Sequence, residues 1–281
     1  PAGIFRYDGI QALPLAIDTP APPMAHADTG GSMVAGLYGL AVSWLRGTIE
    51  SAPSEMTSCA VAQNGLMDLT LPMCFDSTVT GVRLYMTRPD GGELLRAGDY
   101  PIGTVTLSIT LLPQLGAAPQ FLHMDTMPSG LYLSYWRGRL LTAGANVLRF
   151  SEVLAYHIHD QRHGFVQMPQ RITFVRPVDA GIWVGQVDHV AFLAGSGLGE
   201  LELQRRAASA PVPGSAIALK AEQLGEVAEG RDCAVWLAEN GYVVGTAGGM
   251  LIEPMANTMK GVAGQSGASV VFGDRLVTAV T

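Results

Sequence analysis

The sequence is poor in charge, in cysteine and in long apolar runs, and each shortage argues against a class of protein. Only 15% of its 281 residues are charged and the net charge is −7, which disfavours a broad electrostatic grip on nucleic acid phosphates. No apolar run reaches the roughly 20 residues that a bilayer-spanning helix needs. We therefore expect neither a nucleic-acid-binding protein nor a membrane span.

The three cysteines, Cys59, Cys74 and Cys233, are odd in number and contain no CxxC pair. A chain of this length can build a core without disulfides, so free thiols in a protein made in a reducing cytosol are expected. A pairing of Cys59 with Cys74 across two strands is the alternative.

What the sequence has in quantity is apolar residues and turn formers. Nearly half of the residues are apolar, and 34 glycines and 17 prolines punctuate the chain. Because few segments have helical periodicity, this composition predicts a globular all-β protein with many tight turns. In the stretch from Thr80 to Arg88, for example, Val82, Leu84 and Met86 alternate with polar or aromatic residues, which is typical of a strand.

Composition shifts divide the chain into two β-rich parts with short connections. We expect a docked hairpin, a Pro/Ala/Gly-rich linker, a β-sandwich of the immunoglobulin or fibronectin III kind, a second linker, and a region of propeller-type blades. These parts are predicted at residues 1–17, 18–31, 32–112, 113–120 and 121–281.

A small β unit is repeated in the C-terminal part. Its turn-aligned copies begin at Gly138, Ala180 and Asn240, 42 and 60 residues apart, and each copy has a tryptophan near its turn. Periods of roughly 40–50 residues with four strands each are typical of β-propeller blades. Since propellers have about 4–8 blades, three cannot close a ring. The expectation is that further blades precede Pro1 or that another chain supplies them.

One cluster of residues suggests metal chemistry. His157, His159 and His163 lie close together near Asp160, and a strand would place His157 and His159 on one face. No HExxH pattern is present, and the competing interpretation, a polar loop with solvated imidazoles, is favoured. We therefore predict no metal, no cofactor and no catalytic residue, and keep the three histidines as weak metal candidates.

Other motifs are explained more simply by structure. The glycine-rich stretch 195–199 precedes an apparent strand instead of the helix that a phosphate loop needs, so it is interpreted as a turn. Residues 264–268 lack the second glycine of a nucleophile elbow. The four tryptophans are expected in the core rather than on ligand platforms; they are Trp44, Trp136, Trp183 and Trp236.

Several runs of the sequence resemble virion structural proteins of tailed bacteriophages. In the N-terminal part the resemblance is carried by Ala35-Gly36-Leu37-Tyr38 to Trp44 and by Glu50-Ser51-Ala52-Pro53-Ser54. In the C-terminal part it is carried by residues 138–195, which contain Phe150-Ser151-Glu152, and by residues 233–254.

The resemblance implies a β-propeller interrupted by a fibronectin-like module, in the neck or tail of the particle. It implies no catalytic residues, and its partners would be other virion proteins and further copies of the chain. Members of the family usually have propeller sequence before the sandwich. This sequence departs from that pattern, because it starts at Pro1. The alternatives are a carbohydrate-binding adhesin and, less favoured, a propeller glycoside hydrolase, which would need two carboxylates across a cleft.

Overall fold

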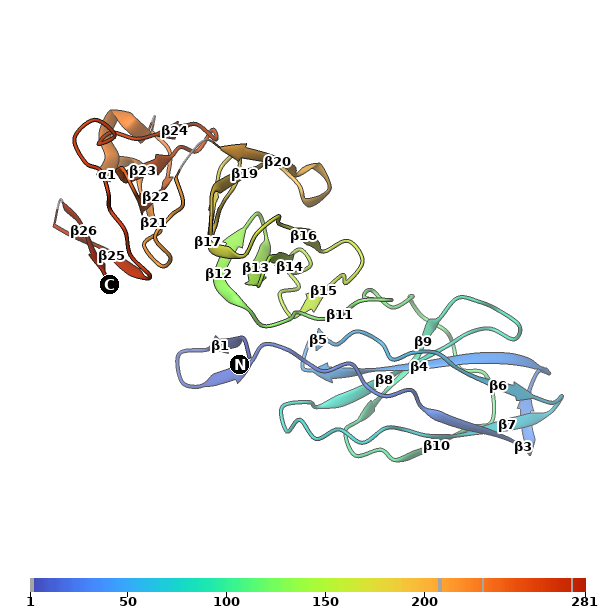
Figure 1. The fold of residues 1–281 in the computed structure, drawn as a ribbon. Coiled ribbons are helices and arrows are strands. Elements are labelled where there is room, and N and C mark those ends of the chain that lie inside the picture. Colours follow the sequence, from blue (N-terminus) through green and yellow to red (C-terminus); the bar gives the residue numbers. More distant parts are fainter. Residues whose placement is uncertain (1–2, 207–208, 229, 274) are drawn as a thin grey trace. The chain divides into compact units, whose positions relative to one another are not determined.

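The computed structural model describes residues 3–206, 209–228, 230–273 and 275–281. The chain is all-β, with 49% of residues in strands and 3% in helices, so the all-β part of the fold prediction is confirmed (Figure 1). It divides into two compact units: unit 1 comprises Pro1–Met127 with Tyr156–Gln161, and unit 2 comprises Pro128–Ala155 with Arg162–Thr281. In the described ranges, no helix has both the length and the apolar character required to cross a membrane.

Unit 1 is built on two antiparallel sheets. The smaller has the order β10-β7-β3, and the larger has the order β5-β4-β8-β9, with β6 also paired to β4. Their strands are β3 (Met24–Met33), β7 (Gly65–Thr70) and β10 (Thr106–Ile109), and β4 (Gly36–Arg46), β5 (Ile49–Glu50), β6 (Thr57–Val61), β8 (Gly81–Met86) and β9 (Leu95–Pro101).

The inner faces of these two sheets share one hydrophobic core. Met67 and Leu69 of the smaller sheet belong to the same buried cluster as Leu40, Val42 and Leu84 of the larger sheet. The predicted alternation in β8 is confirmed, because its alternate apolar residues all join this cluster. All three cysteines lie in the described part of the chain, and they are present as thiols rather than as disulfides.

The N-terminal stretch of unit 1 differs from its expected layout in one place. Strands β1 (Phe5–Tyr7) and β2 (Ala12–Pro14) form the expected hairpin. Residues 18–31, which composition predicts to be a linker, instead contain most of β3. The glycines that suggest a linker are required at a bulge, where a Cβ on Gly31 would lie 2.1 Å from the carbonyl oxygen of Gly65.

Unit 2 contains three four-stranded antiparallel sheets and a final hairpin, in which strands that follow one another along the chain are paired. The strands of the three sheets are β12 (Leu131–Trp136), β13 (Arg139–Gly144), β14 (Val147–Phe150) and β16 (Phe165–Gln167); β17 (Ile172–Val178), β18 (Gly181–Gln186), β19 (Val190–Ala194) and β20 (Glu202–Arg206); and β21 (Ile217–Leu219), β22 (Cys233–Ala238), β23 (Gly241–Gly245) and β24 (Leu251–Ile252). The hairpin is β25 (Gly267–Phe272) with β26 (Arg275–Val280), and the short helical turns are η1 (Leu198–Glu200), α1 (Ala221–Leu224) and η2 (Gly225–Ala228).

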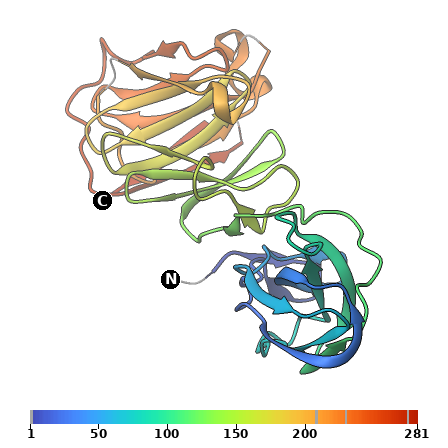
Figure 2. The same ribbon diagram turned by 90° about the vertical axis from the view of Figure 1, so that its right-hand side faces the viewer.

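The sheets of unit 2, drawn in the green-to-red part of the ribbon in Figure 2, pack against one another in chain order. Trp136 and Phe150 of the first sheet share a core with the second. Trp183 of the second sheet shares another with Trp236 of the third, and the hairpin's Val271 packs against the third sheet's outer cluster. Each of the three predicted repeat copies falls in a different four-stranded sheet, but the copies are not in phase. The first two aligned turns join the first and second strands of their sheets, and the third joins the second and third strands.

Candidate functional site

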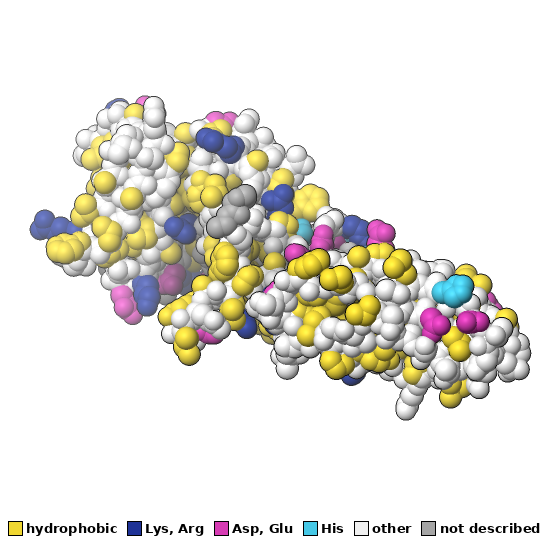
Figure 3. Space-filling view, turned by 90° about the horizontal axis from the view of Figure 1, so that it is seen from below, with side chains coloured by type: hydrophobic (Ala, Val, Ile, Leu, Met, Phe, Trp, Pro, Cys, Tyr) yellow, Lys and Arg dark blue, Asp and Glu magenta, His cyan; other side chains and the backbone are white. Residues whose placement is uncertain are grey.

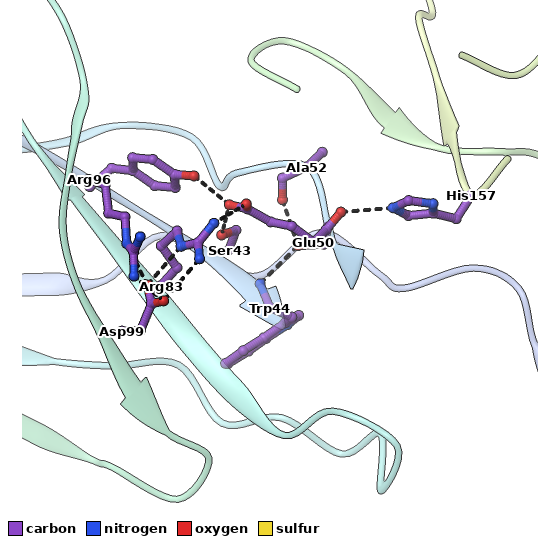
Figure 4. Close-up of polar contacts among 10 residues, drawn as sticks. Ser43, Trp44, Glu50, Ala52, Arg83, Arg96, Asp99 and His157 are labelled. Carbon is purple, nitrogen blue, oxygen red and sulfur yellow. Dashed lines mark hydrogen bonds and ion pairs between the residues drawn. The ribbon is translucent and has the colours of Figure 1, made fainter. Parts of the chain in front are cut away.

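A network of charged and hydroxyl side chains lies across β4, β5, β8 and β9 of unit 1 (Figure 4). The Glu50 carboxylate accepts hydrogen bonds from Ser43 Oγ at 2.6 Å and from the Tyr85 hydroxyl at 2.5 Å. Its second oxygen lies 2.5 Å from Arg83 Nη1. Arg83 also forms a bidentate pair with Asp99, at 2.7 and 2.9 Å, and Asp99 accepts a second guanidinium from Arg96.

The electrostatics of this network favour the charge states that its hydrogen bonds require. The hydrogen bonds from Arg83 hold the pKa of Asp99 below its usual range. Burial and the hydrogen bond to Glu50 raise the pKa of Tyr85, so its hydroxyl stays protonated. Each carboxylate oxygen of Glu50 and Asp99 accepts at least one of these bonds, so the two carboxylates tie together side chains from neighbouring strands. The network therefore acts as a cross-strand brace, which the sequence did not predict.

Serine side chains replace backbone partners beside two inner strands, β4 and β13. The amide of Ser51 donates to the carbonyl of Trp44, and the Ser51 hydroxyl accepts the amide of Trp44 at 2.9 Å. Ser54 makes the same pair of bonds with Val42. In unit 2, Ser151 makes the same pair with Leu140. Two of the motifs that carry the phage resemblance, Glu50–Ser54 and Phe150–Glu152, thus contain serines that pair with a neighbouring strand.

The histidine-bearing segment Tyr156–Gln161 belongs to unit 1, where it forms what we call the clasp. Strand β15 (Ile158–His159) pairs with β11 (Asp125–Thr126), and Ile158 is fully buried. His157 Nε2 lies 2.8 Å from the carbonyl oxygen of Glu50 (Figure 4). The His157 ring also packs edge-on against Phe121. Burial lowers the pKa of His157, so the ring is held in its neutral form.

The three candidate metal ligands occupy different environments. His157 uses Nε2 for the Glu50 carbonyl, His159 is buried in the clasp, and His163 belongs to unit 2. Across the described residues, no group of three or more His, Cys, Asp or Glu side chains has an arrangement that could hold a metal ion.

The remaining chemical motifs are parts of loops and strands. The glycine-rich stretch 195–199 follows β19 and leads through the three-residue turn η1 into β20, so no α-helix begins there. Residues 264–268 lead into β25. The prediction that the tryptophans pack in the core is confirmed, since all four are buried.

Exposed apolar side chains are a prominent surface feature, and Figure 3 shows them at many places on the face that it presents. In unit 2 they lie at both ends of the sheet stack. At the first end, Leu133, Tyr135 and Phe165 of the first sheet are exposed. At the other end, Val270, Phe272 and Val277 of the final hairpin are exposed. The signal for the hairpin was present in its sequence, where apolar residues occupy both alternating sets of positions.

No protein-family model matches the sequence, and no curated protein matches it significantly.

Proposed function

We propose that this chain is a structural subunit of a tailed-phage particle, in its neck or tail, and that it acts through protein–protein contacts rather than through chemistry. The observation that carries the assembly role is the pair of exposed apolar faces at the two ends of the unit 2 sheet stack. Apolar sheet faces of this kind are typical of surfaces that another protein covers. The assignment to a phage particle rests on the resemblance of the sequence.

The finer fold assignment is part of the same proposal. In unit 1 the pairings β3-β7 and β4-β8-β9 support an immunoglobulin or fibronectin III type of sandwich, whose sheets contain B-E and C-F-G neighbours. In unit 2 the face-to-face stack of four-stranded sheets supports propeller-type blades. Among the described residues unit 2 has three four-stranded sheets and a hairpin, fewer complete blades than the about 4–8 of a closed ring, so we infer that the stack is an open segment of a propeller.

Immunogold electron microscopy tests this function. Antibodies against the purified chain should label particles produced by a host that encodes it, at the neck or tail. Antibodies that label the host cell envelope and leave the particles bare would overturn the assignment. Labelling of the head surface alone would overturn the assigned position.

A further inference from the structure

We propose that copies of this chain stack head to tail, with the final hairpin of one copy lying on the first sheet of unit 2 in the next copy. This inference rests on the proposed assembly role and names the partner as a second copy. The two surfaces are the first-sheet face, defined by Leu133, Tyr135, Leu140 and Phe165, and the hairpin face, defined by Ala268, Val270, Phe272, Val277 and Ala279.

The first-sheet face is the side of the β12-β13-β14-β16 sheet that points away from the second sheet. Tyr135 is paired with Leu140, and Arg149 with Phe165, so the members of each pair share a face. The opposite face carries Trp136, Leu141 and Phe150, which are buried against the second sheet. Leu133 is 54% exposed and Tyr135 is 60% exposed, so this face presents apolar and aromatic area to its surroundings, together with the half-buried Arg149.

The hairpin face has the most exposed apolar side chain of the two faces, Phe272. Strands β25 and β26 bury Val271 and Leu276 against the third sheet, while Ser269 and Thr278 on the same inner side are hydrogen-bonded. The outer side of the strands is also largely apolar: Phe272 there is 79% exposed, and its cross-strand neighbour Arg275 is the one charged residue on that side of the two strands. A strand that is apolar on both sides is typical of one covered on both sides. Apart from Arg275, which lies beside the turn, no position on this side of the two strands carries a charge of the kind that protects exposed strands.

The contact would continue an interface that the chain already makes. Each successive sheet of unit 2 covers the apolar outer face of the sheet before it, first to second, second to third and third to hairpin. Aromatic side chains lie in the first two of these interfaces, including Trp136, Trp183 and Phe192. The proposed contact would bring Phe272 against the aromatic members of the first-sheet face, which repeats that composition. In the proposed contact, the first sheet of a second copy covers the hairpin face, as each sheet of unit 2 covers the one before it.

The two faces differ, so the contact is heterologous. A copy that presents its hairpin face to a neighbour keeps its first-sheet face available for another copy. Contacts of this type close into a ring when the rotation between copies allows it, and otherwise form a filament. A two-fold dimer, in which each face meets its own equivalent, would contradict the proposal.

Site-directed cross-linking between differently labelled copies tests the contact. The full chain would carry Cys74→Ser, because Cys59 and Cys233 are already buried. Leu133→Cys and Val270→Cys would be placed in separate preparations with different tags and joined by a short bismaleimide. We expect a covalent pair when the two preparations are mixed and little product from either alone. Phe75→Cys, at an 89% exposed position in unit 1, is the control that should give no product with either partner.

Charge substitution provides the second measurement. Phe272→Asp or Leu133→Asp should each lower the molar mass measured by light scattering toward that of a monomer, and Phe75→Asp should leave it unchanged. If the mass is multimeric but the mixed cross-link fails, or if products form only within one preparation, the head-to-tail contact is overturned. A wild-type chain that is monomeric at every concentration also overturns it. Gold labelling of particles is independent of these results, so the proposed function can stand or fall separately.

Discussion

His157 Nε2 lies 2.8 Å from the backbone carbonyl oxygen of Glu50, 107 residues earlier in the chain. Because a carbonyl oxygen can only accept, the imidazole must donate from Nε2, which identifies the tautomer of the neutral ring. The carboxylate of the same Glu50 holds Ser43, Tyr85 and Arg83. One residue therefore fixes the clasp through its main chain and braces β4, β5 and β8 through its side chain.

Replacing His157 with alanine should loosen the clasp. The substitution removes the donor and leaves the Glu50 carbonyl without this partner, at a cost of about 1–3 kcal/mol. Hydrogen exchange followed by mass spectrometry should show faster exchange at Met127, whose amide donates to the His157 carbonyl. His26→Ala, at an exposed position in β3, is the matched control and should leave these rates unchanged. Equal protection of Met127 in the wild type and in His157→Ala would contradict the role of the clasp.

The same residue should make stability depend on pH. Burial lowers the pKa of His157 in the folded chain, and the positive charge of Arg46 acts in the same direction. The unfolded chain therefore takes up a proton near the ordinary value of 6.5 while the folded chain does not. The free energy of unfolding should be at its plateau above pH 6.5 and fall as the pH drops below it.

The comparison that isolates this effect is His157→Gln, whose amide can donate a hydrogen bond but does not titrate in this range. Urea unfolding of both chains between pH 5 and 8 should give curves that converge at high pH and separate as the pH falls, with the wild type losing more stability. Parallel pH profiles would show that His157 does not contribute to the slope.

Glu50→Gln should weaken the brace across the larger sheet. The amide cannot neutralise Arg83, and its NH2 group would face donors instead of accepting them. We expect a loss of about 1–3 kcal/mol in unfolding free energy, since hydrogen bonds to charged groups are stronger than neutral ones. Denaturant unfolding at neutral pH measures it. Glu55→Gln, five positions along and exposed, should change stability by less than about 0.5 kcal/mol.

Local patterns predicted much of the fold, because strands and turns depend mainly on residues that are close together in the sequence. The alternation in β8 and the turns at Gly138, Ala180 and Asn240 could be recognised from a few positions each. Composition failed at β3, because the glycines at its bulge are the same residues that mark a flexible linker.

The Glu50 network could not be predicted in the same way. Its members come from β4, β5, β8 and β9, and the clasp adds His157 from far along the chain. Which strands become neighbours depends on long-range packing. An alternation of period two predicts a strand but not the strand it pairs with. The histidines were visible as a cluster, but their roles depend on burial and on partners that lie elsewhere in the sequence.

Ser51→Ala should lower the free energy of unfolding, because Ser51 pairs with Trp44 of the inner strand β4. The substitution removes the hydroxyl that accepts the amide of Trp44, and that amide lies in a buried strand. An unpaired buried donor costs about 1–3 kcal/mol, which unfolding of the purified variant would measure. Ser58→Ala is the control, because Ser58 is exposed in β6. A Ser51→Ala chain as stable as Ser58→Ala would mean that water replaces the hydroxyl.

Gly245→Ala should disturb the packing between the second and third sheets of unit 2. A Cβ at this position would lie 2.6 Å from the indole ring of Trp183, which is fully buried and donates its Nε1 hydrogen to the Thr246 carbonyl. The ring has no free volume to move into, because it also contacts Phe192 and Trp236. Overpacking of this kind costs about 1–3 kcal/mol.

The matched control for this substitution is Gly248→Ala, which should be close to neutral because a Cβ there would have no other atom within 4 Å. Thermal unfolding of the two variants, with tryptophan fluorescence as the probe, compares them directly. Gly245→Ala should unfold several degrees below Gly248→Ala, since only the first substitution forces a methyl group against the buried indole. Coincident unfolding curves would refute the packing argument, because they would mean that the added methyl group is accommodated between the two sheets at no measurable cost.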